Sequence, residues 1–352
     1  MTIQNKDYWL NKQQSLTLPA QAFINGEYTD ASDGGTYDTI NPATGELLVK
    51  TAACTEQDVD RAVAAARDTF DSGVWADKAP AERKGIMKKL AALIMEHHEE
   101  LALMESLNVG KPVQDAMNID IPGSAGCFEW YAEAVDKLYG EVAPTDGNNV
   151  ATITREPIGV VAAVVPWNSQ LFLSAVKIGP ALAAGCTVVL KASEEAPAPM
   201  LEFARIFDQA GFPPGVLNVI TGFGPDCGAV LSSHPKVAHV AFTGGPETAR
   251  HIVRNSAENL ASTSLELGGK SPFIVFADAD IESAVNAQVS GIFAATGQSC
   301  VAGSRLVISN AIKEDFLVRL KQKAEAVVIG APDDMATEVG PLCTLRQREN
   351  AL

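Results

Sequence analysis

Positive charge is scarce in this chain of 352 residues. It carries 27 Lys and Arg against 43 Asp and Glu, a net charge of −16 at pH 7. Phosphate backbones and anionic lipid surfaces bind to basic patches, because Lys and Arg must neutralise them. The charge balance therefore excludes nucleic acid and an anionic membrane from the partners that we expect.

Paired cysteines and metal-ligand spacings are missing as well. The six cysteines include no Cys-x-x-Cys pair, and the five histidines show neither His-x-x-x-His nor His-x-His spacing. A disulfide framework and a zinc motif are thereby excluded. We expect free thiols in a reducing compartment, the cytoplasm, and no catalytic metal.

Long hydrophobic runs are absent too. The most apolar stretch, residues 178–190, is flanked by Lys177 and Lys191 and interrupted by glycine and proline, so it is too short to span a bilayer. The polar first residues do not predict a secretory signal. No internal repeat or low-complexity linker is found. The length predicts two domains, and the apolar share of 47% suffices for a sizeable core.

The first 157 residues predict short strands, then helices, then a hairpin. Turn signals such as Asn25-Gly26 indicate strands before residue 55. Apolar spacing indicates helices over 55–69, 81–93, 98–107 and 122–138. Trp130 and Tyr131 in the last helix are expected in the core. Residues 139–157 predict a protruding hairpin available for subunit pairing.

From Ile158 onward, strands and helices alternate. The unbroken apolar run 158–165 is typical of a parallel strand covered on both faces. Further strands are expected at 187–190, 216–220 and 237–242. Helices are expected at 169–184, 198–210 and 244–255, and another helix is expected to end at 232–234. Four such units predict a doubly wound parallel sheet, with ligands at the carboxyl ends of its strands.

Residues that suit a dinucleotide fall at those strand ends. Lys191 and Glu194 follow the second strand, and Gly224 and Gly228 follow the third. The segment Thr243-Gly-Gly245 opens a helix after the fourth, where free N–H groups and the helix dipole favour phosphate. Each loop alone is explained by turn chemistry. Together they favour a dinucleotide site.

Cys300 lies among small residues in the stretch 293–305, which leaves room beside its sulfur. A single cysteine is more often a small buried apolar residue. Glu266 and Asn168 change that balance, because a thiol, a carboxylate and an amide are a nucleophile, a general base and an oxyanion donor.

The chain resembles the NAD(P)-dependent aldehyde dehydrogenase superfamily across almost its whole length. The matching stretches occur in family order: Asn41-Pro-Ala-Thr-Gly45, Gly110-Lys-Pro112, Pro166-Trp-Asn168, Lys191-x-Ser-Glu194, Phe242-Thr-Gly244, Leu265-Glu-Leu-Gly-Gly-Lys270, Gly297-Gln-x-Cys300 and Gly340-Pro-Leu342.

The resemblance implies NAD-dependent oxidation of an aldehyde by Cys300, with Asn168 as oxyanion donor, Glu266 as base for hydrolysis, and Lys177 assisting proton transfer. A surface charge on the helix is the alternative for Lys177. NAD is expected over NADP because Glu194 opposes a 2′-phosphate. The implied cofactor-binding residues are Val165, Pro166, Trp167, Lys191, Ser193, Glu194, Gly224, Gly228, Phe242, Thr243, Gly244, Gly245, Thr248 and Leu267.

The implied architecture is an NAD-binding domain, residues 1–138 and 158–266, an oligomerisation hairpin, 139–157, and the N-terminal part of a catalytic domain, 267–352. The family continues beyond Gly340-Pro-Leu342, so we expect a C-terminally truncated chain with an incomplete second domain. A homodimer or homotetramer is expected for the full-length form. A nucleotide-binding fragment without turnover and a cofactor-independent thiol esterase are the alternative functions.

Four positions depart from the family pattern. Ser169 and Gln170 replace an aromatic residue and a proline, Val176 replaces a tryptophan, and Gly245 replaces a serine that usually touches the pyrophosphate. The first three predict a wide, polar entrance that admits bulky, polar or cyclic semialdehydes. The stretch 167–170 is also similar to dehydrogenases of N-heterocycle catabolism.

Overall fold

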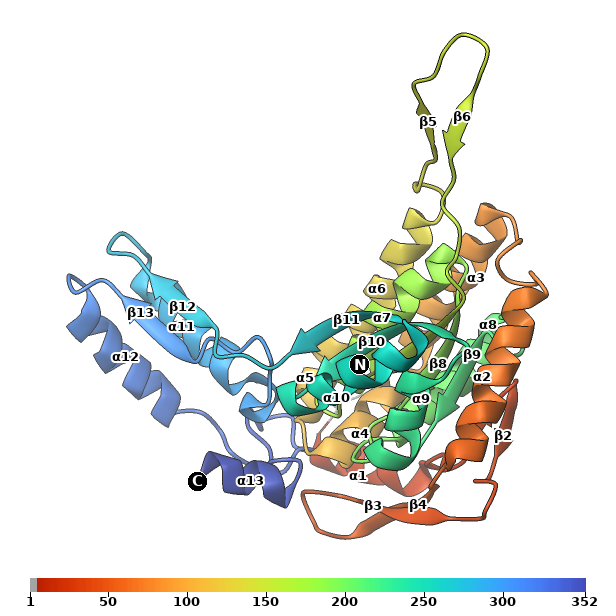
Figure 1. Ribbon diagram of the computed structural model, residues 1–352. Helices are drawn as coiled ribbons and strands as arrows, with labels where there is room; N and C mark the ends of the chain where they lie inside the picture. The colour runs from red at the N-terminus through yellow and green to blue at the C-terminus, as the bar shows by residue number, and fades with distance from the viewer. Residues whose placement is uncertain (1–4) are drawn as a thin grey trace.

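The computed structural model describes residues 5–352. Its centre is a seven-stranded sheet in the order β11-β10-β7-β8-β9-β1-β2 (Figure 1). Strands β11, β10, β7, β8 and β9 are parallel; β1 pairs antiparallel with β9, and β2 pairs antiparallel with β1 at the edge. The chain builds outward from β7 through β8 to β9 and then returns to the other side of β7 with β10. The switch point of this doubly wound sheet therefore lies between β7 and β10.

The strands of this sheet are β1 (Ala22–Ile24), β2 (Glu27–Thr29), β7 (Val160–Val164), β8 (Thr187–Lys191), β9 (Leu217–Ile220), β10 (Val237–Gly244) and β11 (Ser262–Leu267). All residues of β7, β8 and β9 are buried. Their mostly apolar composition suits strands whose two faces are both covered by helices. The four predicted parallel strands are confirmed, whereas β11 was not predicted.

Helices pack on the two faces in separate groups. One face, with Val160 and Ala162, packs on α2 (Glu56–Asp71), α9 (Ala229–Ser233) and α10 (Pro246–Asn259). The other face, with Val161 and Ala163, packs on α7 (Gln170–Ala184) and α8 (Ala198–Ala210). A further layer beyond them holds α3 (Pro80–Glu96), α4 (His98–Val109) and α6 (Ile121–Ala134).

Local signals account for the ends of the N-terminal elements. Asn25 and Gly26 both have positive φ in the β1–β2 turn, as the Asn-Gly signal predicts. A capping box between Thr55 and Asp58 begins α2, and Gly110, with φ of 75°, ends α4. A separate hairpin joins β3 (Thr36–Ile40) to β4 (Leu47–Ala52).

Two expectations in this region are wrong. Helix α1 (Lys6–Ser15) occupies a segment with no predicted helix, and only its Trp9 is buried, which explains the weak apolar pattern. Trp130 is 65% exposed instead of lying in the core, because it faces away from the neighbours of α6. Tyr131, one residue later, does pack against the core as expected.

Two parts project from this body. The hairpin of β5 (Glu141–Ala143) and β6 (Ala151–Ile153) extends away from the rest of the chain (Figure 1). After β11, a small unit pairs β12 (Pro272–Val275) with β13 (Arg305–Ile308) in parallel and packs them on α11 (Ile281–Phe293) and α12 (Lys313–Glu325). Helix α13 (Leu345–Ala351) follows.

Short irregular helices complete the described part of the chain, and those at residues 113–120 and Ala294–Gly297 lie at the cavity described below. Helix α5 (Val113–Asp115) continues into a π-helical turn, η1 (Ala116–Asp120), which leads into α6. A second π-turn, η2 (Gly224–Gly228), follows β9, and a 3₁₀ segment, η3 (Ala294–Gly297), follows α11. Such turns break the regular helix and redirect side chains, often at functional sites.

Candidate active site

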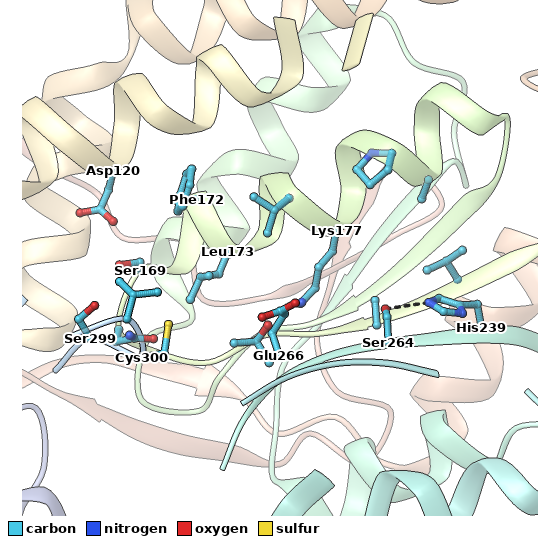
Figure 2. Close-up of a pocket in the computed structure, with 18 of the residues that line it drawn as sticks. Asp120, Ser169, Phe172, Leu173, Lys177, His239, Ser264, Glu266, Ser299 and Cys300 are labelled. Carbon is cyan, nitrogen blue, oxygen red and sulfur yellow. Dashed lines mark hydrogen bonds between the residues drawn. The ribbon is translucent and has the colours of Figure 1, made fainter. Parts of the chain in front are cut away.

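A cavity of about 910 Å³ runs along β7 and β10, from Val161 and His239 toward their amino ends to Asn168 and Thr243 toward their carboxyl ends. Its wall comes from α7, β10, β11, the α5–η1 turn and the loop that follows α11. Cys300, Asn168, Glu266 and Lys177 all line it. In Figure 2, Cys300 lies at one end, Glu266 and Lys177 lie further along, and His239 lies at the other end. The four residues proposed for chemistry thus meet in one space at the switch point.

Cys300 is half-buried and follows the η3 turn. Five other cysteines are also free, and four of them are buried: Cys54, Cys186, Cys227 and Cys343. Burial raises the pKa of the Cys54 and Cys186 thiols, among others. Among the described residues, Cys186 and Cys300 both line the cavity, but Cys186 is buried whereas Cys300 is half-buried.

Asn168 lies just after β7, where the chain turns into α7. Its side-chain Nδ2 donates a hydrogen bond of 2.8 Å to the backbone oxygen of Gln298, two residues before Cys300. An amide group has two N–H bonds, so this contact fixes its orientation and leaves one donor for another acceptor. The contact joins the end of β7 to the cysteine loop.

Glu266 and Lys177 face each other across the cavity floor. Glu266 lies on β11 opposite Thr243 of β10, and its side chain is exposed to the cavity. Lys177 points toward it from α7 and is only 7% exposed (Figure 2). Burial lowers the pKa of Lys177 to about 8, and the charge of Glu266 opposes that shift. The alternative for Lys177, a charge on the helix surface, is therefore wrong.

A buried ion cluster lies behind the Asn168 turn and was not predicted as part of the site. Lys111 Nζ donates to Glu105 at 3.1 Å, to Asp120 at 2.7 Å and to Ser169 Oγ at 3.0 Å. Burial raises the pKa of Glu105 to about 7. The available signal was the Gly110-Lys-Pro112 motif, whose lysine is fully buried. Asp120 and Ser169 carry polar groups from this cluster to the cavity wall.

The entrance departs from expectation at one position. Ser169 and Val176 line the cavity as predicted. Gln170 is fully buried instead, and neither polar atom of its side chain has a hydrogen-bond partner. As the first residue of α7, it points into the protein and does not contribute polarity to the entrance.

The proposed cofactor residues lie at neighbouring strand ends. Lys191, at the end of β8, is buried and forms a 2.7 Å ion pair with Glu194. Gly245 is the N-cap of α10, with no side-chain cap on the first N–H groups of a 14-residue helix. A Cβ added at Gly224, Gly228 or Gly245 would meet nothing within 4 Å, so these backbones are open to a ligand.

Thr243 gives the most direct sign of a missing polar partner. Its Oγ1 is buried beside the Cys300 cavity and has no hydrogen-bond partner. Buried hydroxyls are normally satisfied, so an orphan beside a cavity suits a polar ligand. Leu267 follows Glu266 at the end of β11, and Thr248 is exposed in the first turns of α10. These residues fit a nicotinamide dinucleotide.

Some of the proposed cofactor residues present no side chain to a ligand. Val165 and Phe242 are buried in the two hydrophobic cores. Phe242 also covers Gly244, where a Cβ would lie 2.5 Å from its ring. Trp167 packs on a small cluster that contains Val109. Ser193 is buried. Contacts from Val165 and Phe242 to a cofactor would come from the backbone.

These features together define a nucleotide-dependent thiol enzyme. They are a doubly wound sheet, open loops of the phosphate-binding type at its strand ends, and a cysteine with an amide donor in the adjoining cavity. The sequence pattern of the aldehyde dehydrogenase family matches residues 28–352. The chain belongs to this family, and it is an oxidoreductase of the aldehyde dehydrogenase type. No described helix has the length and apolar character that crossing a membrane requires.

Curated relatives and solved structures agree. The chain is 59% identical over 330 residues to (Z)-2-((N-methylformamido)methylene)-5-hydroxybutyrolactone dehydrogenase of Acinetobacter baylyi, covering 94% of this chain and 67% of the relative. It is 46% identical to the NADP/NAD-dependent aldehyde dehydrogenase PuuC of Escherichia coli, covering 97% and 70%. An indole-3-acetaldehyde dehydrogenase of P. syringae, solved with NAD+ and IAA, superposes with a TM-score of 0.96 at 44% identity, covering 98% and 70%.

Proposed function

We propose that this protein oxidises an aldehyde to the carboxylic acid with NAD as cofactor. The observation that carries the proposal is the convergence of Cys300, Asn168, Glu266 and Lys177 on one cavity beside the open loops of the sheet. Membership in the aldehyde dehydrogenase family supports the same reaction.

Cys300 is the nucleophile. Its thiolate adds to the aldehyde carbon, which forms a C–S bond and moves the carbonyl electrons onto oxygen. The second N–H of Asn168 and the backbone N–H of Cys300 are the donors for this oxyanion. The bond to Gln298 holds the Asn168 amide in place before substrate arrives, so little reorganisation is needed during the reaction.

NAD, when bound, would supply the acceptor for the hydride on the substrate carbon, and Cys300 would then hold the acyl group as a thioester. Glu266 then acts as general base and takes a proton from the water that attacks this thioester. Collapse of the adduct breaks the C–S bond, releases the carboxylic acid and returns the cysteine.

Lys177 assists proton transfer from the floor of the cavity. An ordinary lysine is fully protonated at neutral pH and cannot accept a proton. With a pKa of about 8, Lys177 can release and accept a proton close to neutral pH. Its position toward Glu266 makes it the next acceptor for the proton that hydrolysis delivers.

Glu194 and Lys191 hold the adenosine ribose hydroxyls, since a carboxylate accepts from both hydroxyls of a diol. The free N–H groups at the start of α10 receive the pyrophosphate. Thr243 Oγ1 provides a further polar contact near the cavity. NAD is preferred because the Glu194 charge opposes a 2′-phosphate.

The substrate is a bulky, polar or cyclic semialdehyde. Ser169 and Asp120 place polar groups among apolar wall residues such as Leu173 and Val176. Such a wall accepts a large body that carries a few hydrogen-bonding groups. The name of the Acinetobacter baylyi relative, with its butyrolactone and formamide groups, supports this class. Clear preference for acetaldehyde in a substrate panel would contradict it.

Incubation with NAD and an aldehyde panel separates the three candidate functions. NADH formation by the unaltered chain that disappears in Cys300→Ala supports the dehydrogenase. NAD binding without any NADH would leave a nucleotide-binding fragment, and ester cleavage without cofactor would leave a thiol esterase. Cys127→Ala is the matched control, because Cys127 is a partly exposed cysteine that does not line the cavity.

We propose a domain assignment that is supported by the separate sheets of β5–β6 and β12–β13 beside the seven-stranded sheet. Residues 1–138 and 158–266 form the NAD-binding domain, 139–157 the oligomerisation hairpin, and 267–352 part of the catalytic domain that carries Cys300. The hairpin's exposed apolar residues support a homodimer or homotetramer.

A further inference from the structure

The backbone just before Cys300 adopts an unusual conformation. Ala295 has φ of 52° and Thr296 has φ of 60°, and Gly297 continues with φ of 71°. Three consecutive left-handed residues reverse the chain between α11 and the cysteine. For residues with a Cβ, this conformation costs on the order of 1–2 kcal/mol each, so other contacts must maintain it.

The other left-handed residues with a Cβ in the part of the chain described, residues 5–352, have ordinary explanations. Asn25 lies in a tight hairpin turn, and Leu260 caps the end of α10. Ala295 and Thr296 lie in neither kind of turn. Strain of this kind concentrates at functional sites, where the surrounding structure enforces it.

Contacts from three other segments hold the loop. The Ala295 N–H donates to Asp115 Oδ2 at 3.1 Å. The Thr296 hydroxyl accepts from the Gly340 N–H at 3.1 Å. Gln298 receives bonds at both its backbone oxygen, from Asn168, and its side-chain oxygen, from the Cys343 N–H at 3.0 Å. The loop is therefore fastened on each side of Gly297.

Asp115 is the only one of these anchors that bonds a left-handed residue through a charged side chain. It is half-buried on α5, and it also lines the cavity. Burial raises the pKa of its carboxyl, whereas the Ala295 N–H and the charge of Lys111 lower it. Its neighbours are fixed as well: the Val113 N–H donates to Pro332 at 2.8 Å, and Gln114 donates to Thr337 at 2.5 Å.

We propose that Asp115 is a positioning residue for the nucleophile, because its carboxylate holds Ala295 in the left-handed conformation that places Cys300 in the cavity. This inference rests on the proposed role of Cys300. Asp115 acts through the backbone and touches no reacting atom. Without its acceptor, the 294–299 segment relaxes to an ordinary turn and carries the sulfur away from Asn168.

The first test compares Asp115→Ala with Asp115→Asn, whose amide oxygen retains an acceptor of the same shape. We expect Asp115→Ala to lower kcat at least about tenfold with KM changed by less than about twofold, because small displacements of a nucleophile are costly. Asp115→Asn should retain at least about half of kcat. Glu156→Ala is the matched control, since it removes a carboxylate from the same cavity that has no bond to this loop.

The second test measures Cys300 directly, by its rate of alkylation with iodoacetamide in a Cys127→Ser background, read from the modified peptide. Asp115→Ala should slow this rate at least about fivefold, and Glu156→Ala should leave it unchanged. The measurement needs no turnover. A chain that forms no NADH but shows this pattern would refute the dehydrogenase proposal and leave the positioning role supported.

A third variant separates positioning from general loss of structure. Glycine adopts positive φ without penalty, so Ala295→Gly makes the loop less dependent on Asp115. We expect the double variant Asp115→Ala/Ala295→Gly to recover at least about half of the alkylation rate that Asp115→Ala loses. If Asp115→Ala does not fold, the double variant should instead recover at least about half of the yield of folded protein. Additive effects of the two substitutions, or an Asp115→Ala variant that matches Glu156→Ala, would overturn the proposal.

Discussion

At the scale of single residues, the buried ammonium group of Lys177 links the chemistry of the site to its stability. Burial lowers its pKa to about 8 from an ordinary value of 10.5. Between these two values the unfolded chain binds more protons than the folded one, so this group's contribution to stability rises with pH there. Below about pH 8 the folded protein bears the full cost of a buried charge.

Replacing Lys177 with methionine should therefore change the pH dependence of stability. The stability of Lys177→Met relative to the unaltered chain should fall by about 1–2 kcal/mol between about pH 7 and about pH 9.5, discounted for partial exposure. Urea unfolding at both pH values measures this difference. Lys236→Met, at an exposed lysine, is the control. A difference that is the same at both pH values would contradict the account.

We propose that Glu194 decides between the two nicotinamide cofactors. Its carboxylate, paired with Lys191, stands where a 2′-phosphate would bring further negative charge. Glu194→Gln removes that repulsion and frees the Lys191 ammonium. We expect kcat/KM with NADP, relative to NAD, to rise at least about fivefold. Glu195→Gln is the control at a neighbouring carboxylate without that ion pair, and equal ratios in both variants would refute the assignment.

At the scale of secondary-structure elements, α10 lacks a side-chain cap where the cofactor is proposed to bind. Gly245 has φ of −76°, and a Cβ there would meet nothing within 4 Å. Serine therefore fits without strain, and its hydroxyl adds a donor beside the first N–H groups. Gly245→Ser should tighten NAD binding by about threefold to tenfold, the value of one hydrogen bond. Calorimetric titration measures this change. Gly126→Ser controls for serine placed elsewhere, and an unchanged Kd would argue against a phosphate at α10.

The β5–β6 hairpin is too small and too exposed to be stable through its own contacts. Tyr139 is 75% exposed, Val142 73% and Val150 82%. A protruding strand pair with an apolar surface is suited to extending a sheet of another subunit.

The double variant Val142→Asp/Val150→Asp should therefore have a lower molar mass in light scattering than the unaltered protein. The midpoint temperature of its thermal unfolding should change by less than about 2 °C. Leu47→Asp, at an exposed apolar residue of β4, should leave the mass unchanged. If the double variant keeps the molar mass of the unaltered protein, the hairpin does not contribute to subunit assembly.

The elements also show where sequence reasoning succeeds. Helix α8 was predicted with its observed bounds, because a strong apolar face and the Gly211 cap agree. Strand β11 was not, because Ser262, Thr263 and Ser264 are exposed at the sheet edge and lack the apolar run of a central strand. Trp130 was misplaced because its neighbours pack on α3 and α7 and leave that face of α6 to solvent.

At the scale of the whole molecule, local motifs predicted which residues meet, but not what holds them. Cys300, Glu266 and Asn168 were expected at the site and line one cavity. Asp115 and the Lys111 cluster were not expected, since a hydrogen bond between residues 180 positions apart leaves no local pattern. Gln170 shows the opposite error, because a polar residue beside a site can point inward.

The chain covers 67% of the Acinetobacter baylyi relative and 70% of PuuC. This part contains both the loops that we propose for the cofactor and the cavity lined by Cys300. In the proposed reaction, Cys300 carries the acyl group as a thioester once the substrate carbon has been oxidised. This intermediate should accumulate when the general base is removed.

Mass spectrometry of the acid-quenched Glu266→Gln variant, after mixing with NAD and an aldehyde, tests that claim most directly. A thioester adds the mass of the aldehyde less two hydrogens to the peptide that contains Cys300, whereas simple thiol addition adds the whole aldehyde. We predict the lighter adduct, dependent on NAD and absent from Cys300→Ala. A full-mass adduct, or the lighter adduct on another cysteine, would contradict the account.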